Sequence, residues 1–191
     1  DTAALADMFG IKRFGLIGWS SGGPPVIATS YYYPQRVAFT FSIAGYTDFS
    51  RFPDARQFMA DNGLPGSKMA EKHPLLFDLT AWGVRRADLH RPDFYLRAAK
   101  EEMPTSDQQH LTNPANACLF MRTQQEGLRQ GADGAVQDLK VQWQAWGYDM
   151  GAVTTPVQVV QGEVDAFVPQ AFGRHLAANL PKAQLFLLEG Q

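Results

Sequence analysis

The sequence has almost no cysteine and no long apolar run, and these two shortages argue against several classes of protein. Cys118 is the single cysteine among 191 residues, so no disulfide can form within the chain. We interpret Cys118 as a small buried residue and expect a reducing, cytoplasmic location. No stretch approaches the roughly 18 consecutive apolar residues of a membrane-spanning helix, and the first residues lack the cationic start of a secretion signal. We therefore expect no membrane partner.

The sequence also has no large excess of charge of one sign and no cluster of residues that typically bind metals. The 17 Lys and Arg residues nearly balance 19 Asp and Glu, which gives a formal net charge of -2. Binding to a phosphate backbone requires a basic stripe, so we do not expect nucleic acid as a partner. The histidines, at positions 73, 90, 110 and 175, have no cysteine or carboxylate at metal-ligand spacing, so we predict no metal and no cofactor.

Hydrophobic residues are plentiful, at 45% of the chain, which is enough to build a substantial core in one domain. A short helix is predicted over residues 2–9, ended by Gly10. Residues 14–17 form an apolar run that is typical of a strand buried on both faces of a parallel sheet. A helix over about 22–33 and a strand over 37–44 follow at the spacing of a βαβ unit. The predicted architecture is α/β.

The middle of the chain has helical periodicity broken by prolines and no strand-like run. We expect several short helices here, the last two over about 115–130 and 134–146. Strand-like sequence returns at 157–161 and at 184–188, with a helix over about 169–179 between them. The helical block therefore interrupts a single sheet.

Three parts follow from this pattern. We predict a first α/β core part over residues 1–48, a helical insertion over 49–150 and a second α/β core part over 151–191. Both ends look cut, because the chain opens within a helix and stops in a turn after a strand. We expect the sequence to belong to a longer domain.

The join between the first strand and its helix carries a serine motif. It reads Gly18-Trp19-Ser20-Ser21-Gly22, which contains G-x-S-x-G centred on Ser20. The motif requires a strand before it and a helix after it, because the serine sits on a strained turn that side chains at its flanks would obstruct. Both are predicted here. The alternative is a glycine-rich turn that serves packing alone.

The chemistry of this turn follows from its geometry. A tight turn lifts the Ser20 hydroxyl clear of the sheet edge, where a histidine can take its proton as it attacks a carbonyl. The backbone N–H of Ser21, at the positive end of the following helix, would donate to the oxyanion. Trp19 either narrows the acyl side of the site or fills space behind the turn.

A candidate acid follows a later strand. Asp165 lies between the predicted strand that ends near Gln161 and the helix that follows Pro169, and such loops carry the functional groups of parallel sheets. It would accept the N–H of the histidine and stabilise the imidazolium. Asp48 is a rival acid because it also follows a strand, whereas Asp149 precedes one and is given no catalytic role.

The pairing of G-W-S-S-G-G-P with Q-G-E-V-D-A-F-V-P resembles the α/β-hydrolase fold family, in its serine-hydrolase branch, over nearly the whole chain. The resemblance implies a mostly parallel sheet flanked by helices, with a helical cap inserted between strands. It also implies the chain order nucleophile, acid, histidine, of which Ser20 and Asp165 match the first two. The histidine is then expected just past Gln191, and a second oxyanion donor before Asp1.

The histidines within the chain are poor substitutes. His175 lies on a predicted helix beside an apolar stripe, which turns it away from the strand ends. The other three, His73, His90 and His110, lie in the helical block beside prolines or polar residues, and we expect them at the surface or at helix ends.

The resemblance implies a serine hydrolase that acts on an ester or related acyl substrate through an acyl-enzyme at Ser20. Aromatic and methionine side chains are frequent in residues 49–150, so we expect some to line an apolar pocket and the small-molecule substrate to be hydrophobic. Amide, lactone, carbon–carbon bond and peroxide-forming variants share these motifs. The alternative is a non-catalytic ligand-binding member of the fold. A third interpretation takes the chain as the whole molecule, which should then be a poor catalyst. The oligomeric state stays open.

Overall fold

A parallel sheet forms the centre of the structure. The computed structural model describes residues 1–52, 55, 69–70, 72–101, 103, 105–165 and 167–190. Within these residues, four strands form one sheet in the order β1-β2-β3-β4. The strands are β1 (Phe14–Trp19), β2 (Val37–Ile43), β3 (Val157–Gly162) and β4 (Ala183–Leu188). Every neighbouring pair is parallel, which confirms the predicted α/β class, although β1 runs on to Trp19.

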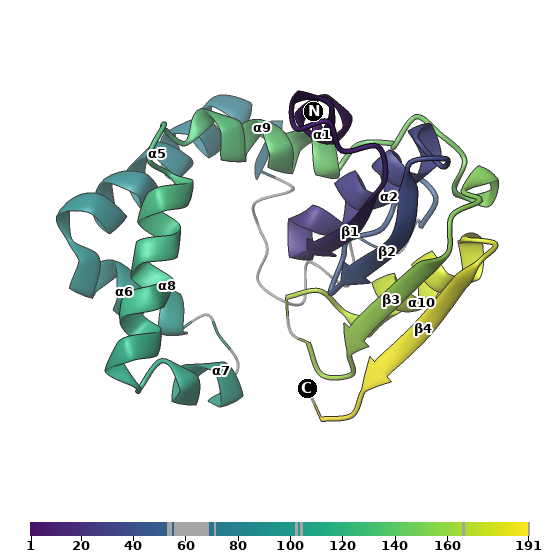
Figure 1. Cartoon of the computed structure of the whole chain (residues 1–191). Helices are drawn as coiled ribbons and strands as arrows, with labels where there is room; N and C mark the ends of the chain where they lie inside the picture. The colour runs from purple at the N-terminus through teal and green to yellow at the C-terminus, as the bar shows by residue number, and fades with distance from the viewer. Residues whose placement is uncertain are drawn as a thin grey trace. The chain divides into compact units, whose positions relative to one another are not determined.

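Helices cover one face of this sheet. The helix α2 (Gly23–Tyr32) packs against β1 and β2, and α10 (Gln170–Asn179) packs against β3 and β4, behind the strands in Figure 1. The core between them is apolar and consists of side chains such as Leu16, Ile27, Val157, Val159, Met150 and Leu176. The N-terminal helix α1 (Thr2–Met8) ends just before Gly10, whose φ of 66° is the left-handed conformation that glycine tolerates.

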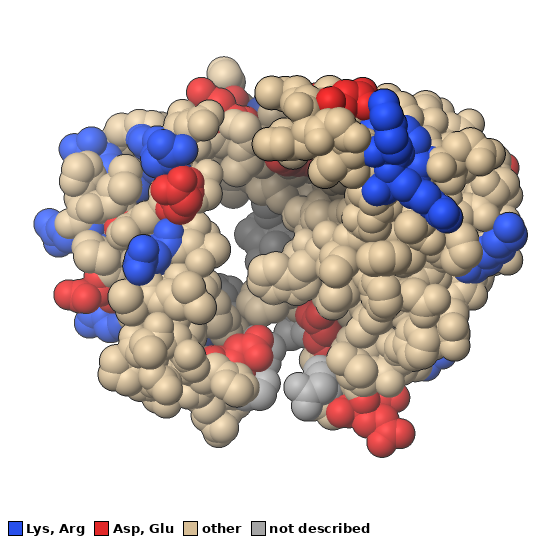
Figure 2. Space-filling model, viewed as in Figure 1, with Lys and Arg blue, Asp and Glu red and all other residues tan. Residues whose placement is uncertain are grey.

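The opposite face of the sheet is more open. Side chains alternate between the two faces of a strand, so Ile17 and Trp19 of β1 point away from α2, and both are exposed. Phe186 and Leu188 of β4 are exposed on the same side. In Figure 2, the Lys and Arg side chains on the face in view stand in separate groups with acidic side chains among them.

The chain divides into two compact units. Residues 1–64 and 142–191 form the unit with the sheet, and residues 65–141 form a helical unit. The described helices of the helical unit are α5 (Pro74–His90), α6 (Pro92–Glu101), α7 (Thr105–His110), α8 (Pro114–Gly127) and α9 (Asp133–Gln142), whose last residue belongs to the sheet unit. Within the helical unit, α5 packs against α6 and α8.

The units differ from the predicted boundaries at 48/49 and 150/151. Phe49, which the sequence pattern assigned to the insertion, is buried against Phe172 of α10. The helix predicted over 134–146 ends at Gln142, because Trp146 and Tyr148 pack against the core of the sheet unit instead of continuing the helix. That the helical unit caps a cleft stays a prediction. Among the apolar residues of the predicted insertion, Phe58, Met59 and Leu64 lie outside the described residues.

The prediction that Cys118 is buried is wrong. The residue lies on α8 and is exposed. The partly buried side chains of α8 recur at positions 117, 120, 121, 124 and 125, which form one face of a helix, and Cys118 lies off that face.

Candidate active site

Ser20 lies on a strained turn. It follows β1 directly and begins the short 3-10 helix η1 (Ser20–Gly22), which leads into α2. Its φ is 53°, a left-handed conformation that is uncommon for a residue with a side chain. Strain of this kind persists only where the surroundings fix it, and it is concentrated at functional sites. The strand, turn and helix that the serine motif requires are all present.

Two glycines make this turn possible. A Cβ atom on Gly18 would lie 2.2 Å from the carbonyl oxygen of Gly22, and one on Gly23 would lie 2.7 Å from the Cα of Gly45. Gly22 itself is different, because a Cβ there would meet nothing within 4 Å. The motif's second glycine therefore contributes no steric relief, and Gly23 at the start of α2 takes that role.

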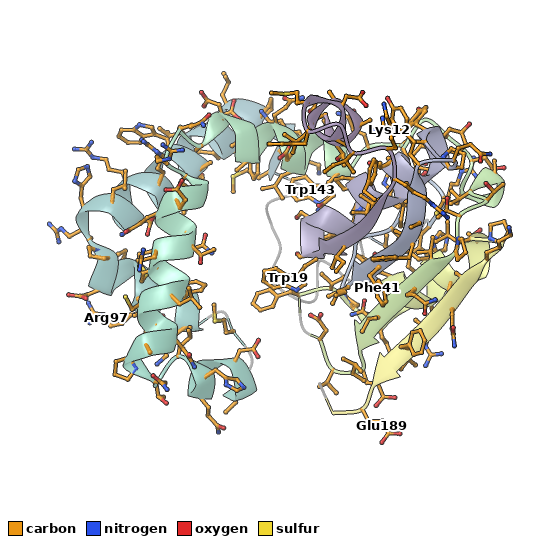
Figure 3. The ribbon with its side chains drawn as sticks, viewed as in Figure 1. Lys12, Trp19, Phe41, Arg97, Trp143 and Glu189 are labelled. Atoms are coloured by element: carbon orange, nitrogen blue, oxygen red, sulfur yellow. The ribbon has the colours of Figure 1, made fainter. Side chains whose placement is uncertain are left out.

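The residues that flank Ser20 are both accessible. Ser21 lies in η1, next to the N-terminus of α2, and its side chain is exposed. Trp19 is 75% exposed and projects from the sheet in Figure 3, so it does not fill space behind the turn. A role for Trp19 toward an acyl group stays a prediction.

Asp165 lies in the loop between β3 and α10. Its Oδ1 atom accepts hydrogen bonds from the backbone N–H groups of Phe167 and Val168, both at 2.9 Å. The other oxygen, Oδ2, accepts from Nε2 of Gln161 at 3.4 Å. The side chain is partly buried. Among the described residues, Oδ1 of Asp165 is held by two loop N–H groups and Oδ2 by one long bond, so Oδ2 can accept a further donor.

The sheet brings Ser20 and Asp165 to the same edge. Trp19 pairs with Ile43, and Ile43 pairs with Val160, so these three residues are level across the sheet. Ser20 comes one position after Trp19, at the C-terminal end of β1. Asp165 comes five positions after Val160, beyond the C-terminal end of β3. In parallel sheets this edge is where ligands bind.

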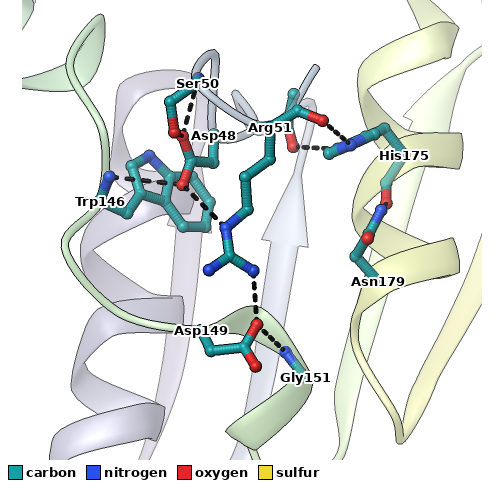
Figure 4. A network of polar contacts seen from close by, with 9 residues as sticks. Asp48, Ser50, Arg51, Trp146, Asp149, Gly151, His175 and Asn179 are labelled. Carbon is teal, nitrogen blue, oxygen red and sulfur yellow. Dashed lines mark hydrogen bonds and ion pairs between the residues drawn. The ribbon is translucent and has the colours of Figure 1, made fainter.

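Asp48, the rival acid, follows β2 at the same edge but is only 1% exposed. Its Oδ1 accepts from the backbone N–H of Ser50 at 2.9 Å and from the Ser50 hydroxyl at 2.6 Å. Its Oδ2 accepts from the backbone N–H of Trp146 at 3.4 Å and lies 4.0 Å from Nε of Arg51 (Figure 4). Asp48 is thus committed to bonds within the sheet unit.

Asp149 also has a structural role. It accepts from Nη1 of Arg51 and from the backbone N–H of Gly151, at the start of the 3-10 helix η2 (Met150–Ala152). These two hydrogen bonds, in that order, lower the pKa of its carboxyl group.

His175 is held by its surroundings at both ring nitrogens. Nε2 lies 3.1 Å from the carbonyl oxygen of Arg51 and so carries a hydrogen, while Nδ1 lies 2.7 Å from the Thr47 hydroxyl (Figure 4). The ring stacks on Phe52 at 4.7 Å between centroids. Burial lowers the pKa of His175, against the bond to Arg51 and the charge of Asp48, which raise it. The other histidines, His73, His90 and His110, are exposed.

Two neighbours of Asp165 escaped the sequence analysis. Burial raises the pKa of the Tyr46 phenol, and the negative charge of Asp165 raises it further. Gln161 is 1% exposed and touches the Asp165 carboxylate. A sequence signal for Gln161 does exist, because it is a polar residue that alternates with Val157 and Val159 on the inward-facing side of β3.

Neither a cluster of metal ligands nor a membrane-spanning helix is found among the described residues. There, no group of three or more His, Cys, Asp or Glu side chains is placed to hold a metal ion. None of the helices among these residues has the length and apolar character needed to cross a bilayer.

Comparison with known proteins identifies the fold. No family model and no curated protein matches this chain. Among solved structures, the esterase RhEst1 from Rhodococcus sp. ECU1013 has a TM-score of 0.59 at 18% identity, over 100% of this chain and 62% of its own. MGS-M2, an α/β-hydrolase from a Medee basin deep-sea metagenome, has 0.58 at 16%, over 98% and 61%.

A third structure, an α/β-hydrolase fold protein from Nakamurella multipartita, has a TM-score of 0.55 at 20% identity, over 100% of this chain and 65% of its own. This chain therefore has the α/β-hydrolase fold, which confirms the fold that the two motifs implied. It spans less than two thirds of the length of each of these structures.

Proposed function

We propose that this protein is a serine hydrolase that acts on an ester or related acyl substrate through an acyl-enzyme at Ser20. The observation that carries the proposal is the left-handed turn at Ser20, with φ 53°, between β1 and α2 at the C-terminal edge of the sheet. In this reaction the Ser20 Oγ attacks the carbonyl carbon while a histidine takes its proton. The histidine then passes that proton to the leaving alcohol, and water hydrolyses the acyl-enzyme.

Two further groups have roles in this proposal. The backbone N–H of Ser21, beside the N-terminus of α2, would donate to the oxyanion that forms on the carbonyl oxygen. Asp165 would accept the histidine N–H on Oδ2, since Oδ1 is occupied by two backbone donors. Because both nitrogens of His175 are engaged elsewhere, we propose that His175 is not the catalytic histidine.

The substrate proposal is a hydrophobic small molecule. Trp19, adjacent to Ser20, is exposed and apolar. Apolar side chains with few polar groups around them are typical of sites for small organic ligands.

Labelling by a fluorophosphonate tests the nucleophile. The protein with its natural termini should be modified at Ser20, as mapped by mass spectrometry, and Ser20→Ala should abolish the modification. Ser21→Ala is the matched control, because it removes the adjacent exposed hydroxyl and keeps the backbone N–H, and it should still be labelled. An unlabelled Ser20 would favour the alternative function, a non-catalytic ligand-binding member of the fold.

A pair of matched esters tests the substrate class. Hydrolysis of a nitrophenyl ester with an apolar acyl chain should exceed that of an ester of equal length ending in a carboxylate. A many-fold preference for the charged ester would overturn the hydrophobic substrate.

A further inference from the structure

Gln161 is a buried polar residue that the proposed mechanism does not use. It lies near the end of β3, where the other inward-facing residues are Val157 and Val159. We propose that Gln161 is a positioning residue, which holds the Asp165 carboxylate in the orientation that receives the catalytic histidine. This inference rests on the proposed function and adds a residue to it.

The hydrogen bonds of Gln161 fix which way its amide points. Nε2 lies 2.6 Å from the carbonyl oxygen of Val168 and 3.4 Å from Oδ2 of Asp165. Both partners are acceptors, since a carbonyl oxygen and a carboxylate cannot donate. The amide nitrogen must therefore face the loop between β3 and α10, here called the acid loop (residues 163–169). One NH₂ group donates to both acceptors.

These contacts span the acid loop. Asp165 lies near its start and Val168 near its end, and the backbone N–H of Val168 donates to Oδ1 of Asp165 at 2.9 Å. The loop is thus closed by the carboxylate itself and tied to β3 by the Gln161 amide. Rotation of the carboxylate would break the bonds to Oδ1, so Oδ2 keeps one direction.

The local packing shows that an amide at this position is costly. Among the described residues, the Oε1 atom of Gln161 is buried without a hydrogen-bond partner, and an unsatisfied buried acceptor costs about 1–3 kcal/mol. The side chain is also confined by α10, since a Cβ on Gly173 would lie 2.9 Å from the Cβ of Gln161. An apolar side chain would avoid the cost at Oε1, so the donors on Nε2 are the reason to keep an amide here.

Gln161→Met is the first test, and Gln170→Met is its matched control. Gln170 is also an amide that ties the acid loop, but its Nε2 donates to the backbone carbonyl of Glu163 at 3.2 Å and not to the carboxylate. Both variants are made in the protein with its natural termini, and the rate of fluorophosphonate labelling at Ser20 is measured. Hydrogen-bond partners that orient reactive ligands commonly change activity by about tenfold or more. We expect that loss for Gln161→Met and less than about threefold for Gln170→Met.

Gln161→Glu gives a readout that a merely structural role would not move. The introduced carboxyl group, when protonated, can donate to the Val168 carbonyl as the amide does, whereas its ionised form cannot donate and repels Asp165. The labelling rate of this variant, divided by the wild-type rate at the same pH, should fall by about tenfold as the pH rises from about 5.5 to about 9. Gln170→Glu should give a ratio that is flat with pH.

The outcomes separate the two proposals. If wild-type Ser20 is not labelled, the serine-hydrolase proposal fails. If wild-type Ser20 is labelled but Gln161→Met matches Gln170→Met and the Gln161→Glu ratio is flat, only the positioning role is overturned. Should Gln161→Met fail to fold, as judged by circular dichroism, the pH series of Gln161→Glu decides alone.

Discussion

Two loops at the same edge of the sheet each carry an aspartate, and the two residues have opposite surroundings. Asp48 comes five positions after Ile43, and Asp165 comes five positions after Val160, its partner on β3. Asp48 is 1% exposed and bonded at both oxygens, within a network that includes Ser50 and Arg51. Asp165 is partly buried, with two hydrogen bonds on Oδ1 and one of 3.4 Å from Gln161 on Oδ2.

The comparison teaches that position at the edge of a sheet does not by itself define a catalytic acid. Each carboxylate accepts two hydrogen bonds on Oδ1 and one bond of 3.4 Å on Oδ2. They differ in burial and in charge partner, because Asp48 is 1% exposed with Nε of Arg51 at 4.0 Å, whereas Asp165 is partly buried. A buried carboxylate beside a cation stabilises the fold, whereas a partly buried one can be both oriented and reached by a histidine. The following changes test that separation.

The largest effect is expected from Asp165→Asn. Asparagine keeps an oxygen to accept from Phe167 and Val168 but loses the charge that stabilises the imidazolium, so labelling at Ser20 should slow by on the order of 10⁴-fold. The melting temperature should change little. Near-normal labelling in this variant would return Asp48 to consideration as the acid.

Asp48→Ala should act on stability instead. Removal of this carboxylate leaves the backbone N–H groups of Ser50 and Trp146 without their acceptor, at a cost of about 3 kcal/mol in the free energy of unfolding, while Arg51 keeps its pair with Asp149. Urea denaturation measures this loss. Labelling of the fraction that remains folded should match wild type, and a rate as low as that of Asp165→Asn would contradict the comparison.

His175→Leu should cost less, about 1–2 kcal/mol, through the lost bonds to Thr47 and the Arg51 carbonyl. The wild-type residue should also make stability depend on pH. Because the folded protein holds the pKa of His175 below its usual 6.5, the unfolded chain binds the proton first as the pH falls. Stability is therefore complete well above pH 6.5 and declines as the pH falls below it, and in urea titrations this part of the decline should vanish in His175→Leu.

The smallest effect is expected from Asp149→Ala. Its carboxylate pairs with Arg51 at the surface, where solvent screens the interaction, and both side chains are substantially exposed. The melting temperature and the labelling rate should both be unchanged within error. A clear drop in the labelling rate would give Asp149 a role that neither the sequence nor its position suggests.

Much of the fold could be predicted because its signals are local. The glycines at the serine turn, the apolar runs of β1 and β3, and Gly10 at the end of α1 depend on short stretches of chain. The limits of the helical block could not be predicted, since Phe49 and Trp146 are apolar residues whose packing partners lie far away in the sequence.

For the candidate site, the sequence predicted which residues would gather but not how each is bonded. Ser20 and Asp165 follow from strand ends and loop positions, which any parallel sheet brings together. The burial and bonding of Asp48 depend partly on Trp146, which is 98 positions away, and the Gln161 contact depends on a loop that folds back on its own strand. Exposure at Trp19 likewise depends on which face of the sheet the helices cover.

The Arg51 network has a consequence for how this fold can change. Arg51 contacts Asp48, just after β2, and Asp149, just before η2. These polar contacts therefore join, within the sheet unit, the segment that follows β2 and the segment that precedes η2. Because these contacts lie within the sheet unit, we expect a chimera that carries another helical unit to keep the register of β2 and β3.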